Sequence, residues 1–170
     1  MKQEVASFLD YVAHSPTVFQ ATQQACDMLD AAGFTRLSEH EAWEILPGGR
    51  YYVTRNRSAL VAFAVPENGF THCQIVASHG DSPTFKLKAH AEGEAAGAYI
   101  RLDVEPYGGM IMSTWFDRPL SIAGRALVRE DGRLVTRLID LDRDAALIPN
   151  MPIHFNRDIN SGYSYNPQTD

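Results

Sequence analysis

In the first half of the chain, the spacing of apolar residues changes from that of helices to that of strands. This change limits the possible folds more than any other feature of the sequence. Between residues 5 and 12 the apolar residues recur at the spacing of one helix face: Val5, Phe8, Leu9 and Val12. A second helical pattern covers residues 18–32, with Thr17 as its predicted N-cap and Gly33 as its predicted end. Three β-rich segments follow, at 50–54, 59–65 and 72–79. Two helices followed by three strands predict an α/β layer.

The third predicted strand, residues 72–79, ends in the sequence Ser-His-Gly-Asp-Ser-Pro. Its apolar centre predicts a buried strand, and Pro83 stops the strand because proline has no N–H to donate. His79 and Asp81 would then point to the same side of an extended chain, with Cα atoms about 6.5–7 Å apart. The end of a central strand is a usual place for ligand chemistry, and a metal-binding histidine commonly relies on a nearby carboxylate. The pair is therefore a candidate metal or catalytic site, and the alternative is that both residues only form a turn.

Beyond about residue 90 the pattern is almost entirely β. Residues 89–97 are rich in Gly, Ala and Glu, which predicts a linker or turn and a domain boundary at about residue 90. Four β-rich segments follow, at 99–104, 110–116, 120–129 and 134–141. Asp131 and Gly132 form a typical hairpin turn between the last two. Strands at this spacing predict an all-β module.

Composition excludes several classes of protein. The 170 residues are 45% hydrophobic and 21% charged, so the chain can bury a substantial core. The net charge of −6, without a cluster of Lys and Arg, argues against a nucleic-acid partner. The sequence has no apolar run of membrane-spanning length and no signal-peptide core, so we expect no membrane partner. Cys26 and Cys73 lie far apart without metal-binding spacing, which favours a reducing cytoplasm.

Three polar residues outside the His79 motif have a functional and a simpler interpretation. His14 lies at the break between the predicted helices, where a surface turn histidine is the simpler interpretation. Asp117 could bind a metal, but an ion pair with Arg118 that stabilises a corner is favoured. His154 lies in an apolar connector stiffened by prolines, where a packed, hydrogen-bonded histidine is more common than a ligand.

Six short stretches, in order along almost the whole chain, carry a resemblance. They are HSPT (14–17), GGRYYVTRNRSAL (48–60), ASHGDSP (77–83), YGG (107–109), STWFDRPL (113–120) and IPNMPIHFNRDIN (148–160). Together they resemble the N-terminal portion of the M18 family of metallo-aminopeptidases, the aspartyl aminopeptidase group. One departure is Gly80, where the family often has Thr.

The resemblance implies a fold and a set of site residues. The fold would be α/β, with a partial zinc-exopeptidase-like catalytic domain over residues 1–90 and an incomplete, inserted β-rich dimerisation domain over residues 91–170. His79 matches the first metal ligand of the family, and Asp81 matches the carboxylate that supports the metal centre. His154 matches a histidine that reaches a neighbouring subunit's active site and helps to hold the substrate or the developing oxyanion. Asp117 takes a structural role.

The resemblance also implies an activity. The full-length protein would hold two Zn²⁺ ions per subunit, with Mn²⁺ or Co²⁺ as alternatives, and would remove N-terminal residues, preferably Asp or Glu, from peptides. It would self-associate into a homo-oligomer, a dodecamer in the family. A catalytic zinc needs about three protein ligands and this chain offers one match, so we expect a fragment that is inactive alone. A non-catalytic assembly module, in which His79 is a turn residue, and a metal-independent peptide binder stay open as alternatives.

Overall fold

The computed structural model describes residues 2–162, 164 and 166 and shows a mixed helix and sheet fold with two compact units. One unit contains the residues up to Asp81 together with Ile122–Asp142, and the other contains Ser82–Ser121 and the described residues from Arg143 onward. The contact boundary therefore follows Asp81. The expected division of roles near residue 90, between a catalytic and an assembly part, stays a prediction.

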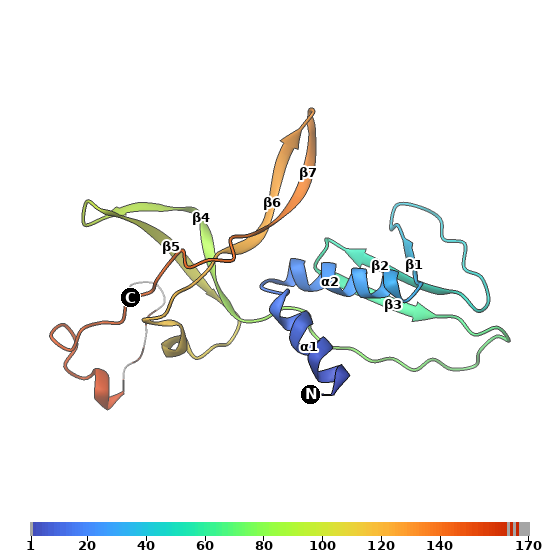
Figure 1. The fold of residues 1–170 in the computed structure, drawn as a ribbon, viewed down its shortest axis with the longest axis horizontal. Helices are drawn as coiled ribbons and strands as arrows, with labels where there is room; N and C mark the ends of the chain where they lie inside the picture. The colour runs from blue at the N-terminus through green and yellow to red at the C-terminus, as the bar shows by residue number, and fades with distance from the viewer. Residues whose placement is uncertain (1, 163, 165, 167–170) are drawn as a thin grey trace. The chain divides into compact units, whose positions relative to one another are not determined.

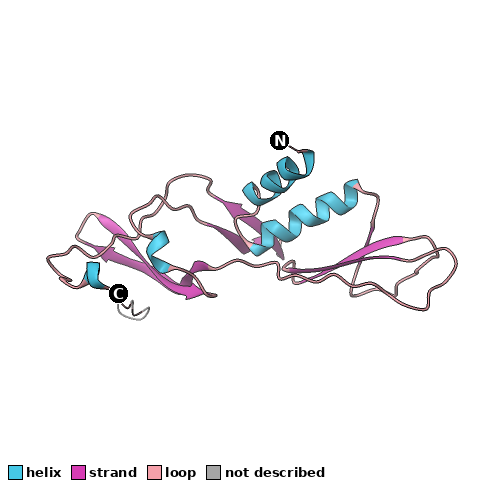
Figure 2. Cartoon of the chain, turned by 90° about the horizontal axis from the view of Figure 1, so that it is seen from below, coloured by secondary structure: helices cyan, strands magenta, loops and turns pink. Residues whose placement is uncertain are grey.

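Two helices open the first unit, as the apolar spacing predicts. Helix α1 spans Gln3–Ala13 and helix α2 spans Val18–Ala31. The Thr17 hydroxyl caps α2 by accepting a hydrogen bond of 3.2 Å from the Phe19 N–H. Gly33 follows α2 with φ of +76°, a conformation in which glycine is not strained. The two helices contact each other (Figure 2), and neither one, among the described residues, is long and apolar enough to cross a membrane.

A three-stranded sheet follows in the order β1-β2-β3 (Figure 1). The short strand β1, Thr35–Leu37, runs parallel to β2, Arg50–Arg55, and was not predicted. Strand β2 pairs antiparallel with β3, Ala59–Ala64, which confirms the predicted hairpin. The turn between them places Asn56 and Arg57 at positive φ, 51° and 54°.

The core of the first unit lies between α2 and this sheet. Tyr52 of β2 has no exposed surface, and its hydroxyl donates a hydrogen bond of 2.7 Å to Oδ1 of Asp30 at the end of α2. Burial, with the neighbouring Asp30 carboxylate, raises the pKa of Tyr52 to about 12. Cys26 is 3% exposed, and burial likewise raises the pKa of its thiol. The helix and the sheet are thus joined by one aromatic side chain with a satisfied hydroxyl.

A second hairpin completes the first unit. It consists of β6, Ala123–Glu130, and β7, Arg133–Asp140, joined at the predicted Asp131-Gly132 turn. The side-chain amide of Gln20 in α2 donates 2.9 Å to the Ile139 carbonyl. This bond ties the hairpin to the helix although the two residues are 119 positions apart.

The second unit is built on a long antiparallel hairpin of β4, Thr84–Ala95, and β5, Tyr99–Tyr107. Residues 89–97 were predicted as a linker or turn. The linker is wrong, because most of these residues belong to β4, and only the last two form a turn. The register of β4 shifts between Leu87 and Glu92, a local bulge. The tight turn at Ala96 and Gly97, both with positive φ, closes the hairpin.

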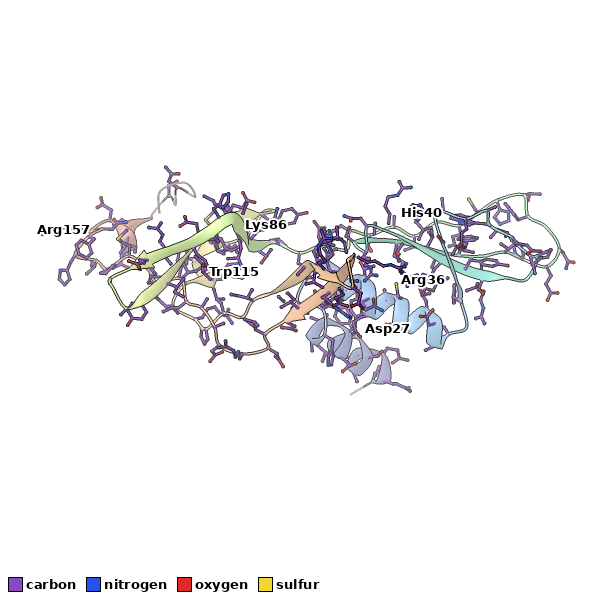
Figure 3. All side chains as sticks on the ribbon, turned by 90° about the horizontal axis from the view of Figure 1, so that it is seen from above. Asp27, Arg36, His40, Lys86, Trp115 and Arg157 are labelled. Carbon is purple, nitrogen blue, oxygen red and sulfur yellow. The ribbon has the colours of Figure 1, made fainter. Side chains whose placement is uncertain are left out.

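The strand predicted over residues 110–116 is also wrong. The structure has a 3₁₀ helix, Met112–Trp115, in its place. The Thr114 hydroxyl donates a hydrogen bond of 2.7 Å to the Ile111 carbonyl. In a strand, that carbonyl would instead accept from the backbone of a neighbouring strand, so this side-chain bond favours the helical turn. Trp115, which Figure 3 labels, then packs edge-to-face on Phe85 of β4, and their ring centroids are 5.5 Å apart. A second 3₁₀ helix spans Ile159–Ser161.

Residues 72–83 contain no helix or strand, so the predicted buried strand at 72–79 is wrong as well. Ile75 and Val76, the centre of that pattern, are 80% and 92% exposed. An extended segment becomes a strand only when another backbone accepts and donates its hydrogen bonds, and no described residue pairs with this segment.

Candidate functional site

The imidazole of His79 faces Asp81 through its Nδ1 atom. Nδ1 lies 2.9 Å from the main-chain oxygen of Asp81 and 3.3 Å from its carboxylate Oδ1. Both neighbours are hydrogen-bond acceptors, so Nδ1 carries the proton in the neutral ring. The lone pair of the neutral imidazole is therefore on Nε2. The sequence predicted this pair, and the structure brings the two side chains together even though the strand before them is not formed.

Local backbone explains how the pair forms without a strand. Gly80, between the two residues, has open space around it, since no atom of the described chain lies within 4 Å of the position of a Cβ. Pro83 lies against Gly108, 3.5 Å from where a Cβ of that glycine would be, and Gly108 has φ of +76°. His79 and Asp81 therefore make their contact in a segment without regular secondary structure.

The arrangement fits one ligand of a metal site. The His79 side chain is 84% exposed, and a histidine whose Nδ1–H is held by a carboxylate is the usual form of a zinc-binding imidazole. A catalytic zinc takes about three protein ligands. Within the part of the chain that the structure describes, no group of three or more His, Cys, Asp or Glu side chains is placed to hold a metal ion. The chain thus supplies one oriented ligand, and a complete site needs further donors.

His154 belongs to the second unit and is exposed. It lies in a turn in which the N–H groups of Phe155 and Asn156 donate 2.9 Å and 3.2 Å to the Pro152 carbonyl. The interpretation of His154 as a packed core histidine is wrong, because its surface is open to solvent. An exposed imidazole on a hydrogen-bonded turn is suited to contact another molecule.

Asp117 is a corner residue, as expected, but its partner differs from the predicted one. Its backbone has φ of 54°, its N–H donates 3.0 Å to the Ile148 carbonyl, and its Oδ1 accepts 2.9 Å from the Asn150 N–H. Arg118 instead donates 3.3 Å to the Thr114 carbonyl. Sequence reasoning missed Asn150, and no local signal could have found it because the two residues are 33 positions apart.

His14 is exposed at the break between α1 and α2. Its Nδ1 lies 2.9 Å from the Asp10 carbonyl, one helical turn earlier. The structure therefore supports the simpler interpretation of a surface histidine at a helix end.

A comparison with known families decides the relationship of this chain. The family described as Aminopeptidase I zinc metalloprotease (M18) matches residues 11–170. The chain belongs to the M18 family. This M18 chain has its His79 and Asp81 within the matched range, and His154 as well.

Relatives of known sequence extend the match over the whole M18 chain. It is 43% identical over 180 residues to "Probable M18 family aminopeptidase 2" of Clostridium acetobutylicum, covering 100% of this chain and 41% of that protein. It is 42% identical over 164 residues to the protein of the same name from Pseudomonas putida (strain GB-1), covering 95% and 38% respectively. The chain thus spans about two fifths of the length of these relatives.

Solved structures show the same fold. A chain in the cryo-EM structure of the Ape4 and Nbr1 complex has a TM-score of 0.88 and 42% identity, over 95% of this chain and 31% of that one. The S. cerevisiae mApe1 dodecamer gives a TM-score of 0.76 and 30% identity, over 88% and 36%. The helices, sheet and hairpins described above are therefore those of M18 proteins.

Proposed function

We propose that the full-length protein containing this chain is a metal-dependent aminopeptidase that removes N-terminal residues from peptides. Membership of a zinc metalloprotease family supports zinc as the metal. The observation that carries the proposal is the contact between His79 and Asp81, which leaves the Nε2 lone pair of an exposed imidazole available for a cation.

His79 and Asp81 have distinct roles in this proposal. His79 is a metal ligand through Nε2, and Asp81 holds the ring by accepting from Nδ1–H. By holding Nδ1–H, the Asp81 carboxylate fixes the tautomer and the orientation of the ring, so that Nε2 is presented to the metal. When bound, a pair of zinc ions would supply Lewis acidity and an activated water, and Mn²⁺ or Co²⁺ are alternatives because histidine and carboxylate ligands accept several metals.

His154 is proposed to bind substrate in the active site of a neighbouring subunit. Its exposure on a closed turn supports this role, since the imidazole is accessible and two hydrogen bonds to the Pro152 carbonyl close the turn around it. A ring N–H aimed at the developing oxyanion would stabilise the transition state, and loss of such a donor typically costs 10²- to 10³-fold in kcat.

Self-association is proposed because His154 requires a neighbour. The β6–β7 hairpin presents Leu127 and Leu134, each 66% exposed, and their register places both on the same face. Exposed apolar side chains on one face favour burial against another surface. The structural relative mApe1 forms a dodecamer, which supports a homo-oligomer here.

Two further parts of the proposal concern specificity and completeness. We propose a preference for acidic N-terminal residues, Asp or Glu, following the aspartyl aminopeptidase group that the motifs resemble. We also propose that the 170-residue chain is inactive alone, because His79 is one ligand where about three are needed.

The decisive experiment measures the hydrolysis of aspartyl and leucyl chromogenic amides by the full-length protein. The proposal predicts activity with preference for the aspartyl substrate, loss of activity in His79→Ala, and no enzyme-like activity of the purified 170-residue chain. An active 170-residue chain, confirmed by intact mass, would show that the ligand count is wrong. An inactive full-length protein whose zinc binding and assembly are unchanged in His79→Ala would favour the assembly-module alternative.

A further inference from the structure

Two segments distant in the sequence run together at the corner where Asp117 lies. The Leu120 N–H donates 2.9 Å to the Ala146 carbonyl, and the Ala146 N–H donates 3.0 Å back to the Leu120 carbonyl. Three residues earlier the Asp117 N–H donates 3.0 Å to Ile148. The connector that leads to His154 is therefore held to the 116–120 segment at two backbone positions.

Asp117 adds a third bond, made by its side chain. The Asn150 N–H donates 2.9 Å to Asp117 Oδ1, and the Met151 N–H donates 2.9 Å to Asn150 Oδ1. This short chain of hydrogen bonds ends directly before Pro152, whose carbonyl accepts the bonds that close the His154 turn. Hydrogen bonds at Ile148, Asn150 and Met151 thus lead from the corner to the turn.

The other end of the corner is anchored on the β4–β5 hairpin. Trp115, two residues before Asp117, packs edge-to-face on Phe85 of β4. Aromatic contacts of this kind fix ring orientation as well as burying area. Asp117 therefore lies between Trp115, which packs on the β4–β5 hairpin, and the loop that carries His154.

The backbone conformation of Asp117 limits which residue types can occupy this position. A φ of 54° is rare for residues other than Gly, Asn and Asp. Of these three, only Asp and Asn offer a side-chain oxygen at the Oδ1 position. The corner thus requires both a left-handed backbone and an acceptor.

We propose that Asp117 is a positioning residue that sets the orientation of His154 toward the active site of a neighbouring subunit. The inference rests on the proposed function of His154. Asp117 does not touch substrate. It fixes the backbone of Asn150, and through it the turn on which the imidazole is carried. A displacement of about 1 Å at a reacting group can cost 10²-fold in rate, so loosening this corner would be costly.

Two substitutions at Asp117 test whether its side-chain acceptor is needed, and a third substitution elsewhere is the control. Asp117→Gly keeps the left-handed backbone and removes the acceptor, and Asp117→Asn keeps both. Asp131→Gly is the matched control, because Asp131 also has a positive φ, 47°, at the β6–β7 turn. In the full-length oligomer we expect kcat to fall about 10- to 100-fold in Asp117→Gly. Asp117→Asn and Asp131→Gly should stay close to the wild type.

Mixed oligomers distinguish positioning from general destabilisation. Asp117→Gly subunits keep an intact His79, and His79→Ala subunits keep an intact His154. Co-expressed with separate tags and purified as hetero-oligomers, the two should regain activity, because the His79→Ala subunit donates a correctly placed His154 to its neighbour. A fold defect confined to the Asp117→Gly subunit would not be repaired in this way.

A His154→Ala and His79→Ala mixture tests the proposed function separately. Failure of this pair to regain activity would remove the role of His154 in a neighbouring site, and with it the inference. If this pair regains activity but the Asp117→Gly pair does not, or if Asp117→Gly alone keeps wild-type kcat, the positioning role is overturned. Should Asp117→Gly not assemble, Asn150→Pro removes the donor of the same bond and is tested in the same mixtures. If neither variant assembles, the corner supports the fold as a whole and the inference is wrong.

Discussion

Nδ1 of His79 lies 2.9 Å from the main-chain oxygen of Asp81 and 3.3 Å from its carboxylate, although the strand expected before them is absent. The pair forms in a segment without regular secondary structure, with only Gly80 between the two residues. Two acceptors thus lie at Nδ1 of the imidazole, and Nε2, on the other side of the ring, points away from them. The arrangement of the proposed metal ligand is therefore a local property of residues 79–81.

The role of Asp81 is tested by replacing its carboxylate with an amide. Asp81→Asn in the full-length protein should lower zinc affinity by about 10- to 100-fold, because the Nδ1–H of His79 loses a charged acceptor. The measurement is competitive zinc titration with a chromogenic chelator. Asp144→Asn, at an exposed aspartate of the second unit, is the control and should leave the affinity unchanged. Equal affinities of Asp81→Asn and the control would mean that the carboxylate does not support the site.

The buried hydroxyl of Tyr52 should contribute to stability. Tyr52→Phe removes the hydrogen bond to Asp30, which should lower the free energy of unfolding by about 1 kcal/mol, since the exposed carboxylate can be solvated instead. Urea denaturation followed by circular dichroism measures this difference. Tyr99→Phe is the control, because Tyr99 is 73% exposed and its loss should change stability by no more than about 0.5 kcal/mol.

Tyr52 should also give the protein a pH-dependent stability at high pH. The pKa of its phenol is raised from 10.0 to about 12, first by burial and then by the hydrogen bond to Asp30. Between these values the unfolded state releases a proton that the folded state keeps, so its stabilising contribution is complete below pH 10 and is lost as the pH rises toward 12. Urea midpoints measured from pH 8 to 12 should therefore fall more steeply in the wild type than in Tyr52→Phe. Parallel slopes would contradict the assignment.

The cap of helix α2 is a separate test of local structure. Thr17→Ala removes the hydroxyl that accepts from the Phe19 N–H and should cost about 1 kcal/mol of stability. Thr17→Ser keeps the hydroxyl and should stay within about 0.5 kcal/mol of the wild type. If both variants unfold at the same urea concentration, the hydroxyl does not stabilise the helix.

Elements with strong local signals could be predicted from the sequence. Thr17 and Gly33 mark the ends of α2, and the Asp131-Gly132 pair marks the β6–β7 turn, because capping and turn conformations depend on residues close in the chain. The pairing of His79 with Asp81 was predictable for the same reason. Because only one residue separates them, the two side chains can meet without a strand before them.

Features that depend on distant residues could not be predicted. Residues 72–79 have the apolar pattern of a buried strand, but a strand forms only against a partner, and periodicity does not identify one. Strand β4 forms only by pairing with β5, which the sequence pattern of 89–97 does not identify. Its small residues therefore suggested a linker or turn. The bond from Asn150 to Asp117 joins segments 33 positions apart, and the adjacent Arg118 suggested a different partner.

The measurement that tests the central claim most directly is the zinc content of the full-length protein with and without the His79 imidazole. The wild type, His79→Ala and the control His90→Ala, at an exposed histidine of β4, would be dialysed against zinc and analysed by elemental analysis. We predict that His79→Ala loses bound zinc while His90→Ala matches the wild type. Equal zinc per subunit in all three proteins would contradict the account, because His79 would then not be a ligand.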